Sequence, residues 1–488
     1  MKREMGIGTA FVMISSIVNV ATSYIINVGL ARYLGAALFG VVGVITSLYQ
    51  INRAVLHAGI PKAMSKYLPE PNRDEGSIIK AAFKLHMIMT AFMVLFYMIF
   101  SKQIAALLND DSLRIYIFYI GIIVIPLSLF YFYVDGYLNG LRWFRREAIA
   151  TMISSLFRLL FIFLFVFIGL EVFGVLWGYF TSLAVSIFIS VLLFGVPSFM
   201  AKENFPKKKL ILFALPIVAS SLSLIFMRNL DTLLVKSLLR DNSLVGYYTA
   251  AMTISNIPYI IFSTLALTLL PSISKSTSEK NLELTKRYIT LSMRYLLLGL
   301  LPITALITAT AKEAIIFLYS FEYAAGGEAL SFLILSTMFL VIFLTCTSII
   351  SGSGEPGLSF WFTLIGAAVL MITGIQFIPS LGMKGAAMAS LCASLIAFVI
   401  TFSYIIHKFH CFVKVKSAIN ILVSSGIIFV LALWIHPSGF YLLFFYTLLM
   451  LLYVLLLYLL REITSDDIEL VKNLYERITL VFRKRREI

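Results

Sequence analysis

Long apolar segments, separated by short polar connections, follow one another along almost the whole chain. Most of them exceed the roughly 20 apolar residues that an α-helix needs to cross the hydrocarbon core of a bilayer. Of the 488 residues, 60% are hydrophobic and only 13% are charged. A water-soluble protein of this composition could not cover its surface with polar groups. The sequence therefore predicts an all-α polytopic membrane protein.

We predict about 14 transmembrane helices, each long enough to span the bilayer. Their expected ranges are 7–31, 39–66, 78–101, 113–138, 147–169, 173–197, 209–237, 244–272, 285–311, 328–351, 357–378, 384–406, 418–435 and 439–461. Lys and Arg concentrate in every second connection, and the positive-inside rule places those connections in the cytoplasm. An even number of spans then puts both termini on the cytoplasmic side of the cell membrane.

The second half of the chain repeats landmarks of the first half. The turn at Leu34-Gly35, followed by Phe39-Gly40, has its counterpart in Val245-Gly246, about 200 residues later. Further pairs of landmarks are Pro61 and Pro271, Ser65-Lys66 and Ser274-Lys275, Gly140 and Gly352, and Gly174 and Gly385. A long-period duplication in an apolar chain is typical of transporters built from two similar bundles, with the substrate between them.

The predicted architecture is thus two pseudo-symmetric six-helix bundles followed by two additional helices. We expect the N-terminal bundle at 1–198, a cytoplasmic linker at 199–209 and the C-terminal bundle at 210–407. The two additional transmembrane helices should occupy 408–461. A cytoplasmic amphipathic tail should occupy 462–488, with Thr464 or Ser465 as its helix cap.

A polar stripe in the second predicted span is the strongest functional signal. Thr46, Gln50, Arg53 and His57 follow one another at spacings of four, three and four, so they share one helical face. Ionisable side chains inside a span usually face a bundle interior or a water-filled cavity. Arg53 could form a cationic wall for a phosphate or diphosphate headgroup. The alternative is an arginine paired with an acid elsewhere to hold the packing.

The seventh and eighth predicted spans contain a second set of candidates. Arg228 and Asp231 are three residues apart and could neutralise each other in a local ion pair. Asp231 could instead reach across to Arg53, or take up a proton or a sodium ion during transport. Asn256, close to Pro258, is expected to break the eighth span and expose backbone groups, as at many transporter binding sites.

Other polar residues within the first six spans complete the set of candidates. Asn19 and Asn27 lie on a polar stripe that either lines a cavity or bonds to a neighbouring helix. Asp135 and Arg158 could pair with each other to form an inner gate.

Several absences limit the range of functions. The sequence contains no P-loop, no HExxH or GxSxG motif and no paired-cysteine motif, so it predicts no enzymatic activity, no bound cofactor and no metal site. The net charge is +15, but the basic residues lie in short connections rather than on a soluble face, so no nucleic-acid partner is expected. Coupling of transport to H⁺, Na⁺ or the membrane potential stays open.

Three motifs, in this order and spacing, resemble a known family. They are LARYLGAALFG at 30–40, the pattern D-x(14)-G-Y-Y-x-A-A at 231–251, and LTLLPSISK at 267–275. The chain resembles the polysaccharide-export and oligosaccharide-flippase branch of the multidrug/oligosaccharidyl-lipid/polysaccharide exporter superfamily. It is similar to its Wzx-like and stage-V-sporulation-protein-B-like members.

The resemblance implies two six-helix bundles around a central cavity, alternating access, and passage of an undecaprenyl- or dolichyl-linked sugar across the cytoplasmic membrane. Lipid II flippases of this superfamily use basic cavity residues, and Arg53 and Arg228 match them in kind. The chain lacks the fuller set of arginines expected for lipid II, which favours a different lipid-linked glycan.

The predicted function is a flippase for a polyprenyl-(di)phosphate-linked oligosaccharide, working in the assembly of cell-surface polysaccharide or glycan. The expected partners are the lipid-linked oligosaccharide, membrane lipids and glycan-assembly enzymes. The alternative is a cation-coupled multidrug antiporter of the same fold. An antiporter requires an acidic cavity for its cationic drugs, and the one candidate carboxylate that we identify in the N-terminal bundle is Asp135.

Overall fold

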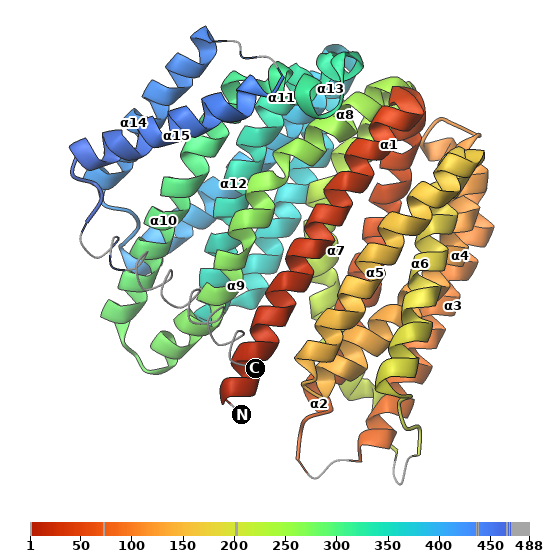
Figure 1. Ribbon diagram of the computed structural model, residues 1–488. Helices are drawn as coiled ribbons and strands as arrows, with labels where there is room; N and C mark the ends of the chain where they lie inside the picture. Colours follow the sequence, from red (N-terminus) through yellow and green to blue (C-terminus); the bar gives the residue numbers. More distant parts are fainter. Residues whose placement is uncertain are drawn as a thin grey trace, which may run out of the picture.

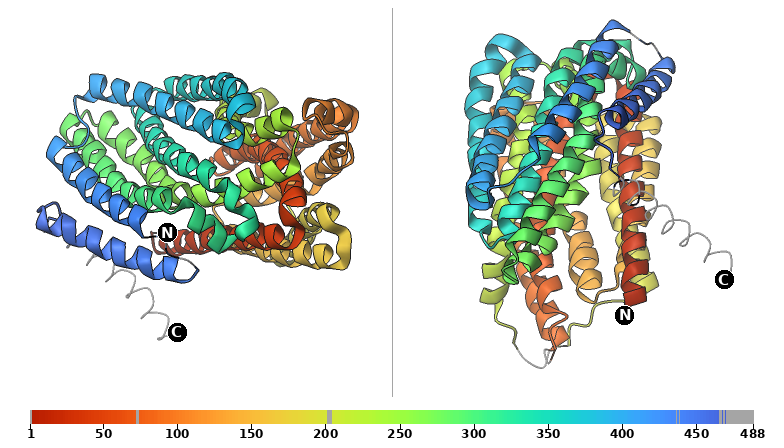
Figure 2. Two further views of the ribbon diagram at one scale, coloured as in Figure 1. Left: turned by 90° about the horizontal axis from the view of Figure 1, so that it is seen from above. Right: turned by 90° about the vertical axis from the view of Figure 1, so that its left-hand side faces the viewer.

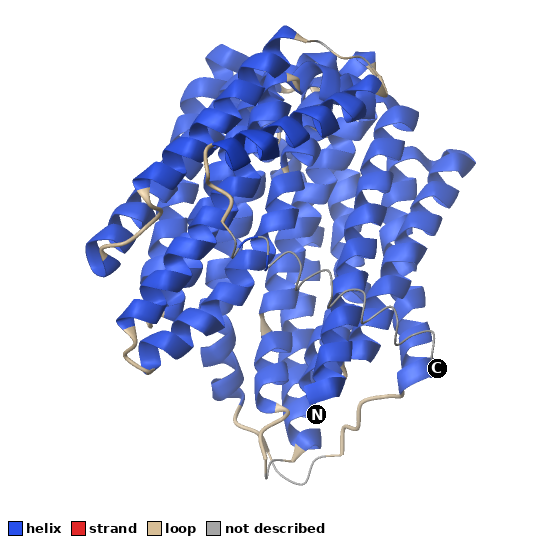
Figure 3. Cartoon of the chain, turned by 60° about the vertical axis from the view of Figure 1, so that its left-hand side comes forward, coloured by secondary structure: helices blue, strands red, loops and turns tan. Residues whose placement is uncertain are grey.

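The computed structural model describes residues 2–71, 74–200, 204–435, 437, 439–464, 467 and 469. Within these ranges the regular structure is helical throughout, without a strand (Figures 1 and 3). The first half contains α1 (Lys2–Ala58), α2 (Ile60–Tyr67), α3 (Glu75–Leu107), α4 (Leu113–Tyr131), the π-helix η1 (Phe132–Leu138), α5 (Phe144–Phe165), the π-helix η2 (Val166–Leu170) and α6 (Glu171–Phe194). The second half contains α7 (Lys207–Leu239), α8 (Asn242–Ser255), α9 (Ile257–Ser278), α10 (Leu282–Ala309), α11 (Ala311–Leu318), the 3₁₀ helix η3 (Phe321–Gly326), α12 (Gly327–Gly352), α13 (Pro356–Phe409), α14 (Val415–Trp434) and α15 (Tyr441–Leu459).

Three helical stretches are far too long for one membrane crossing. The described residues contain 11 stretches apolar enough to span, and three of these have 57, 51 and 54 residues. Each of the three changes direction at a glycine with positive φ, namely Gly35 (75°), Gly169 (95°) and Gly382 (59°). Such φ values are strained for any residue with a Cβ. Counting these three stretches twice gives about 14 crossings, as predicted.

The helices form two groups that meet along α1, α7 and α8. Figure 1 shows α2–α6 on one side and α9–α15 on the other, and the view from above in Figure 2 separates the same groups. The chain is therefore a polytopic helical membrane protein, and the predicted fold class is confirmed. The exact domain boundaries at 198, 209 and 407 stay predictions.

The repeated glycines serve equivalent packing roles within the two halves. A Cβ atom on Gly174 would lie 2.8 Å from the backbone carbon of Phe165, just after the turn at Gly169. A Cβ atom on Gly385 would lie 2.2 Å from the carbonyl oxygen of Phe377, just after the turn at Gly382. Small residues here let two helices of a hairpin approach closely.

The two halves also touch each other through a reciprocal contact between α1 and α8. A Cβ atom on Gly40 would lie 1.9 Å from the Asn242 carbonyl oxygen, and one on Gly246 would lie 2.0 Å from the Ala36 carbonyl oxygen. Each glycine thus meets the residue four positions before the other glycine, which is the pattern of a two-fold contact.

Further hydrogen bonds join the two halves at the same end of the molecule. Arg32 donates to the carbonyl oxygens of Leu318 (2.9 Å) and Phe317 (2.9 Å). The Tyr323 hydroxyl donates to the Ala31 carbonyl oxygen at 2.8 Å. We call this region, which contains residues 31–40, 107–112, 236–246 and 317–326, the closed end; it lies at the top of Figure 1, opposite the N-terminus.

The two additional helices pack against α10, at the edge of the molecule farthest from α2–α6 (Figures 1 and 2). The Tyr453 hydroxyl of α15 donates to the Leu298 carbonyl oxygen at 3.0 Å, and the Tyr446 and Thr310 hydroxyls lie 2.6 Å apart. Beyond α15, the Thr464 amide donates to Asp467 at 2.9 Å, as in a helix cap. Most of the predicted amphipathic tail, including its apolar face, lies outside the described residues.

Candidate functional site

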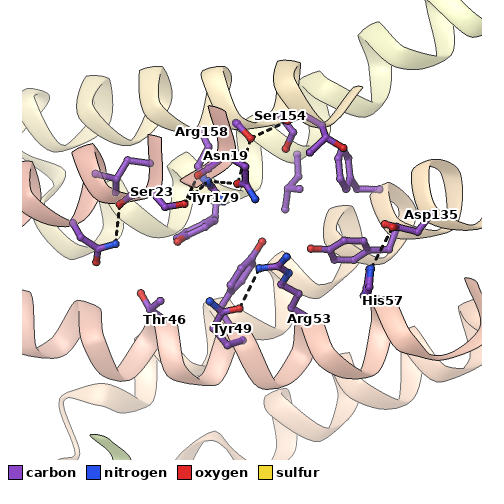
Figure 4. A pocket seen from close by; sticks show the side chains of 18 residues that line it. Asn19, Ser23, Thr46, Tyr49, Arg53, His57, Asp135, Ser154, Arg158 and Tyr179 are labelled. Atoms are coloured by element: carbon purple, nitrogen blue, oxygen red, sulfur yellow. Dashed lines mark hydrogen bonds and ion pairs between the residues drawn. The ribbon is translucent and has the colours of Figure 1, made fainter. Parts of the chain in front are cut away.

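A polar cavity of about 200 Å³ lies inside the N-terminal group of helices (Figure 4). Residues of both halves of α1, of α4, η1, α5 and α6 form its wall. The lining residues are Asn19, Ser23, Ile26, Asn27, Thr46, Tyr49, Gln50, Arg53, His57, Phe130, Tyr131, Asp135, Thr151, Ser154, Ser155, Arg158, Tyr179 and Leu183. The two predicted polar stripes of α1 therefore line one cavity.

Arg53 projects into this cavity from the second half of α1. Its side chain is exposed, although the residue lies within a span. One guanidinium nitrogen lies 3.5 Å from Gln50 Oε1, and Tyr131 also interacts with the guanidinium. No carboxylate of a described residue lies within ion-pair distance of Arg53, so its charge is available to a ligand.

Arg158 faces Arg53 from the opposite wall (Figure 4). Its Nη2 donates to Asn19 Oδ1 at 2.8 Å and to Ser23 Oγ at 2.9 Å. The Ser155 hydroxyl, one helical turn earlier on α5, also donates to Asn19 Oδ1 at 3.3 Å. In the described part of the chain the buried Arg158 Nε has no hydrogen-bond partner. The stripe of α1 thus both lines the cavity and bonds to a neighbouring helix, so the two expected roles coexist.

Asp135 is the carboxylate of the cavity wall, and it is already paired. It lies in the π-helix η1, a distortion that is frequent at functional sites. His57 Nε2 lies 3.3 Å from Asp135 Oδ1, and Lys62 Nζ lies 4.0 Å from the same oxygen. The expected pairing of Asp135 with Arg158 is not formed in this structure, because each side chain is held by other partners, and their role as a gate stays a prediction.

The candidates of the C-terminal half lie outside this cavity. Arg228 donates to Asn256 Oδ1 at 3.0 Å, and its guanidinium carbon lies 3.8 Å from the centre of the Tyr259 ring. As predicted, Asn256 interrupts the eighth span, since α8 ends at Ser255 and α9 begins at Ile257.

Asp231 is buried among hydroxyl groups rather than cations. Its carboxylate accepts hydrogen bonds from the Tyr248 hydroxyl (2.6 Å), the Ser390 hydroxyl (2.9 Å) and the Thr232 amide (2.8 Å). Neither the expected ion pair with Arg228 nor the expected link to Arg53 is formed. Arg228 instead makes the contacts with Asn256 and Tyr259, and Arg53 lies in the separate cavity.

Three tyrosines of the cavity wall were not predicted as site residues. The rings of Tyr49 and Tyr179 lie 4.5 Å apart, and Tyr131 packs edge-on against His57 at 5.4 Å. Tyr131 stands one helical turn before Asp135, and that spacing could have identified it. In the described ranges no cluster of three His, Cys, Asp or Glu residues could hold a metal ion.

Comparison with known families assigns the chain. The model of the polysaccharide biosynthesis protein family matches residues 6–277, which is more than half of the chain. The chain belongs to this family. The model of the MatE family matches residues 216–375. The chain is thus a membrane transporter of the multidrug/oligosaccharidyl-lipid/polysaccharide exporter superfamily, in its polysaccharide and lipid-linked flippase branch, as the motifs indicated.

Two curated relatives share parts of the sequence. The uncharacterized membrane protein YabM of Bacillus subtilis (strain 168) is 26% identical over 190 residues, which cover 38% of this chain and 35% of that protein. The succinoglycan biosynthesis transport protein ExoT of Rhizobium meliloti (strain 1021) is 24% identical over 343 residues, which cover 69% of this chain and 67% of that protein. The first alignment thus spans about a third of the relative.

Solved structures share the fold. The lipid II flippase MurJ in its inward closed conformation matches with a TM-score of 0.73 and 16% identity, over 92% of this chain and 97% of that chain. An inward-facing MATE family transporter matches with a TM-score of 0.70 and 15% identity, over 83% of this chain and 98% of that chain. An outward-facing MATE family transporter matches with a TM-score of 0.57 and 15% identity, over 83% of this chain and 95% of that chain. The chain thus has the fold of these transporters.

Proposed function

We propose that this protein flips a polyprenyl-(di)phosphate-linked oligosaccharide across the cytoplasmic membrane. The observation that carries the proposal is the pair Arg53 and Arg158, which face one cavity without a carboxylate partner among the described residues. Guanidinium groups bind phosphate oxygens through parallel, charge-assisted hydrogen bonds. The relatedness to a succinoglycan transport protein and the shared fold of a lipid II flippase support the same substrate class.

The size of the cavity determines which part of the substrate it receives. Its volume of about 200 Å³ lies below the roughly 300–1,000 Å³ of pockets that enclose drug-sized ligands. It therefore accepts the phosphate groups with the first sugar, while the rest of the glycan extends toward the gap between the bundles. The lipid chain stays in the bilayer. Hydroxyl and amide groups of Tyr49, Tyr131, Thr46 and Asn27 on the wall supply hydrogen bonds to sugar hydroxyls.

The transport cycle follows from the arrangement of the bundles. With the N-terminus in the cytoplasm, the closed end faces outward, and the headgroup enters from the cytoplasmic side. Two like charges across one cavity repel each other, and a bound anion removes that repulsion. Binding thereby lowers the free energy of a state in which the bundles close around the headgroup and open outward.

Asp231 is the proposed coupling site. A buried carboxylate without a countercation is unfavourable, and among the described residues only hydroxyl and amide groups solvate this one. Uptake of a proton or a sodium ion would neutralise it. Because Asp231 links α7, α8 and α13 of the C-terminal half, its neutralisation can change their packing without direct contact with the headgroup.

The match to the MatE model favours one alternative function, a cation-coupled multidrug antiporter. A cationic drug would need a free carboxylate in the cavity. Asp135 is engaged by His57 and Lys62, and the facing arginines repel cations. The electrostatics of the cavity thus favour the anionic substrate.

Reconstitution into liposomes tests the proposal. A fluorescent polyprenyl-diphosphate sugar in the inner leaflet is protected from an external quencher until it is flipped. We expect Arg53→Ala and Arg158→Ala to lower the flip rate by about 10- to 150-fold each, the value of a hydrogen bond to a charged group. Arg114→Ala, an exposed arginine at the start of α4, is the matched control.

The outcome distinguishes the two functions. Unchanged flip rates in both cavity variants would refute the cationic-site mechanism. Ethidium transport driven by a sodium or proton gradient, together with no flipping of the labelled lipid, would instead establish the antiporter.

A further inference from the structure

One ion pair connects the two halves at the closed end. Lys236, near the end of α7, places its Nζ 2.6 Å from Asp110 Oδ2 in the connection between α3 and α4. The Lys236 side chain is only 1% exposed, whereas Asp110 is 17% exposed. The lysine of the C-terminal half is therefore sealed from water by contact with the N-terminal half.

Both partners are held in place by further hydrogen bonds. Ser112 donates to Asp110 Oδ1 through its hydroxyl (2.6 Å) and its amide (3.0 Å). The Lys236 ammonium also donates to Asn242 Oδ1 at 2.5 Å, at the first residue of α8. Because the geometry of each partner is set within its own half, the pair can separate and re-form without refolding.

Backbone contacts surround the ion pair. The Asn109 amide group donates to the Ser237 carbonyl oxygen at 2.8 Å, and the Ser237 hydroxyl donates to the Leu107 carbonyl oxygen at 2.7 Å. These bonds exclude water from the pair while the end is closed. When the halves separate, water can solvate both charges.

We propose that Lys236 and Asp110 form an ionic latch that holds the closed end shut and breaks once in every transport cycle. The Coulomb attraction of a buried pair is roughly offset by the loss of hydration, so the latch leaves the open and closed states close in free energy. It acts chiefly by orienting the two halves. Removing one partner alone leaves the other charge buried and unpaired, which favours the open state.

Distances between spin labels across the closed end test this latch in the full-length protein. Labels at Arg114→Cys and Lys312→Cys report the separation, because both residues are exposed and belong to opposite halves. Cys392 and Cys411 are replaced by serine, and the buried Cys346 is retained because a label cannot reach it.

We expect Asp110→Asn to raise the population of the longer distance at least about tenfold, since it leaves the buried lysine without its countercharge. Lys236→Met should act less strongly, because the remaining Asp110 reaches water. The double variant should lie closer to the wild type than Asp110→Asn does, and this non-additivity is the signature of a direct pair. Asp111→Asn, the exposed neighbouring acid, is the control and should change nothing.

Two results would overturn the latch. Distance distributions equal to wild type in both single variants would show that the pair does not hold the closed end. Purely additive effects in the double variant would show that the two residues act independently. Neither result depends on the identity of the transported lipid, so the latch and the proposed substrate class can fail separately.

Discussion

Gly40 and Gly246 occupy corresponding positions in a reciprocal contact, each against the carbonyl oxygen of the residue four positions before the other. The contact joins the two copies of the internal repeat at corresponding landmarks, Phe39-Gly40 and Val245-Gly246. A pseudo-two-fold axis therefore passes through the closed end. The contact lies within the closed end, so it must separate when the two halves rotate against each other and this end opens.

Alanine at either glycine should weaken this contact. The new Cβ atom of Gly40→Ala would lie 1.9 Å from a carbonyl oxygen, so the two backbones must separate. We expect a loss of about 1–3 kcal/mol in stability, typical of overpacking, and longer distances between the labels at Arg114 and Lys312. Gly426→Ala on α14 is the control, because no atom lies within 4 Å of its added Cβ.

The control should instead show a slightly higher melting temperature, since alanine favours a helix by about 1 kcal/mol over glycine. Wild-type label distances in Gly40→Ala would contradict the role of the contact.

Features of the fold that depend on local sequence were predicted correctly. The length of the apolar segments and the spacing of the glycines predicted the hairpin turn at Gly35 and the break at Asn256 correctly, because both depend on local chemistry. The pairing of charged side chains was predicted less well. The partner of Asp135 is His57, which belongs to another helix. Packing of the helices brings the two side chains together, and the local sequence around Asp135 does not indicate which helix supplies the partner.

The sequence also could not predict which arginines lie in the same cavity. Arg53 was identified from the stripe on its own helix. Arg158 was assigned to a gate, because no local pattern indicates that its helix lies opposite Arg53. Arg228 was placed in the same cavity by analogy, whereas it contacts Asn256 and Tyr259 in the other half.

Arg158→Lys should separate charge from geometry at the phosphate site. Lysine keeps the charge but cannot hold a planar fork between Asn19, Ser23 and a phosphate. We expect a flip rate about tenfold lower, equivalent to about 1.4 kcal/mol. Arg158→Gln, which also removes the charge, should lower it further. Equal rates for wild type, Arg158→Lys and Arg158→Gln would mean that Arg158 does not contact the headgroup.

Asp231→Asn tests the coupling site. The amide preserves one oxygen that can accept from Tyr248 and Ser390 but cannot take up a proton or bind a sodium ion as a carboxylate does. We expect flipping to continue down a gradient of labelled lipid and to lose its response to an imposed H⁺ or Na⁺ gradient. Asp111→Asn should retain any such response. Gradient-driven flipping that persists in Asp231→Asn would exclude this carboxylate as the coupling group.

Arg294 on α10 binds the segment after α15 through two carboxylates of that segment. It donates to Glu462 Oε1 at 2.8 Å and to Asp467 Oδ1 at 2.9 Å. The hydrogen bond from Arg294 holds the pKa of Asp467 well below its usual range. Burial raises the pKa of Glu462, but hydrogen bonds from Ser417 and Arg294 outweigh it, so the net shift is downward. Both carboxylates therefore carry charge at neutral pH.

Replacement of Arg294 by an uncharged residue should release this segment from α10. In Arg294→Met the two carboxylates lose their cation, and we expect hydrogen exchange of residues 460–464 to accelerate, with a loss of up to about 3 kcal/mol in local stability. Arg461→Met, an exposed neighbour, should leave the exchange unchanged. Equal protection in both variants would show that packing of α15 alone fixes the segment.

The pH dependence of the closed end should follow Asp110. Burial raises the pKa of this carboxyl group, but hydrogen bonds from Lys236 and Ser112 outweigh it, so the net pKa lies below the ordinary value of 3.8. A lowered pKa in the closed state means that the latch contributes its full stabilisation above the ordinary pKa and loses it as the pH falls through the lowered one. The label distances across the closed end should therefore stay constant from about pH 8 to about pH 5 and lengthen only in stronger acid. An opening with a midpoint near pH 6.5 would instead point to a histidine, and a wild-type pH profile in Asp110→Asn would show that another group controls the closed end.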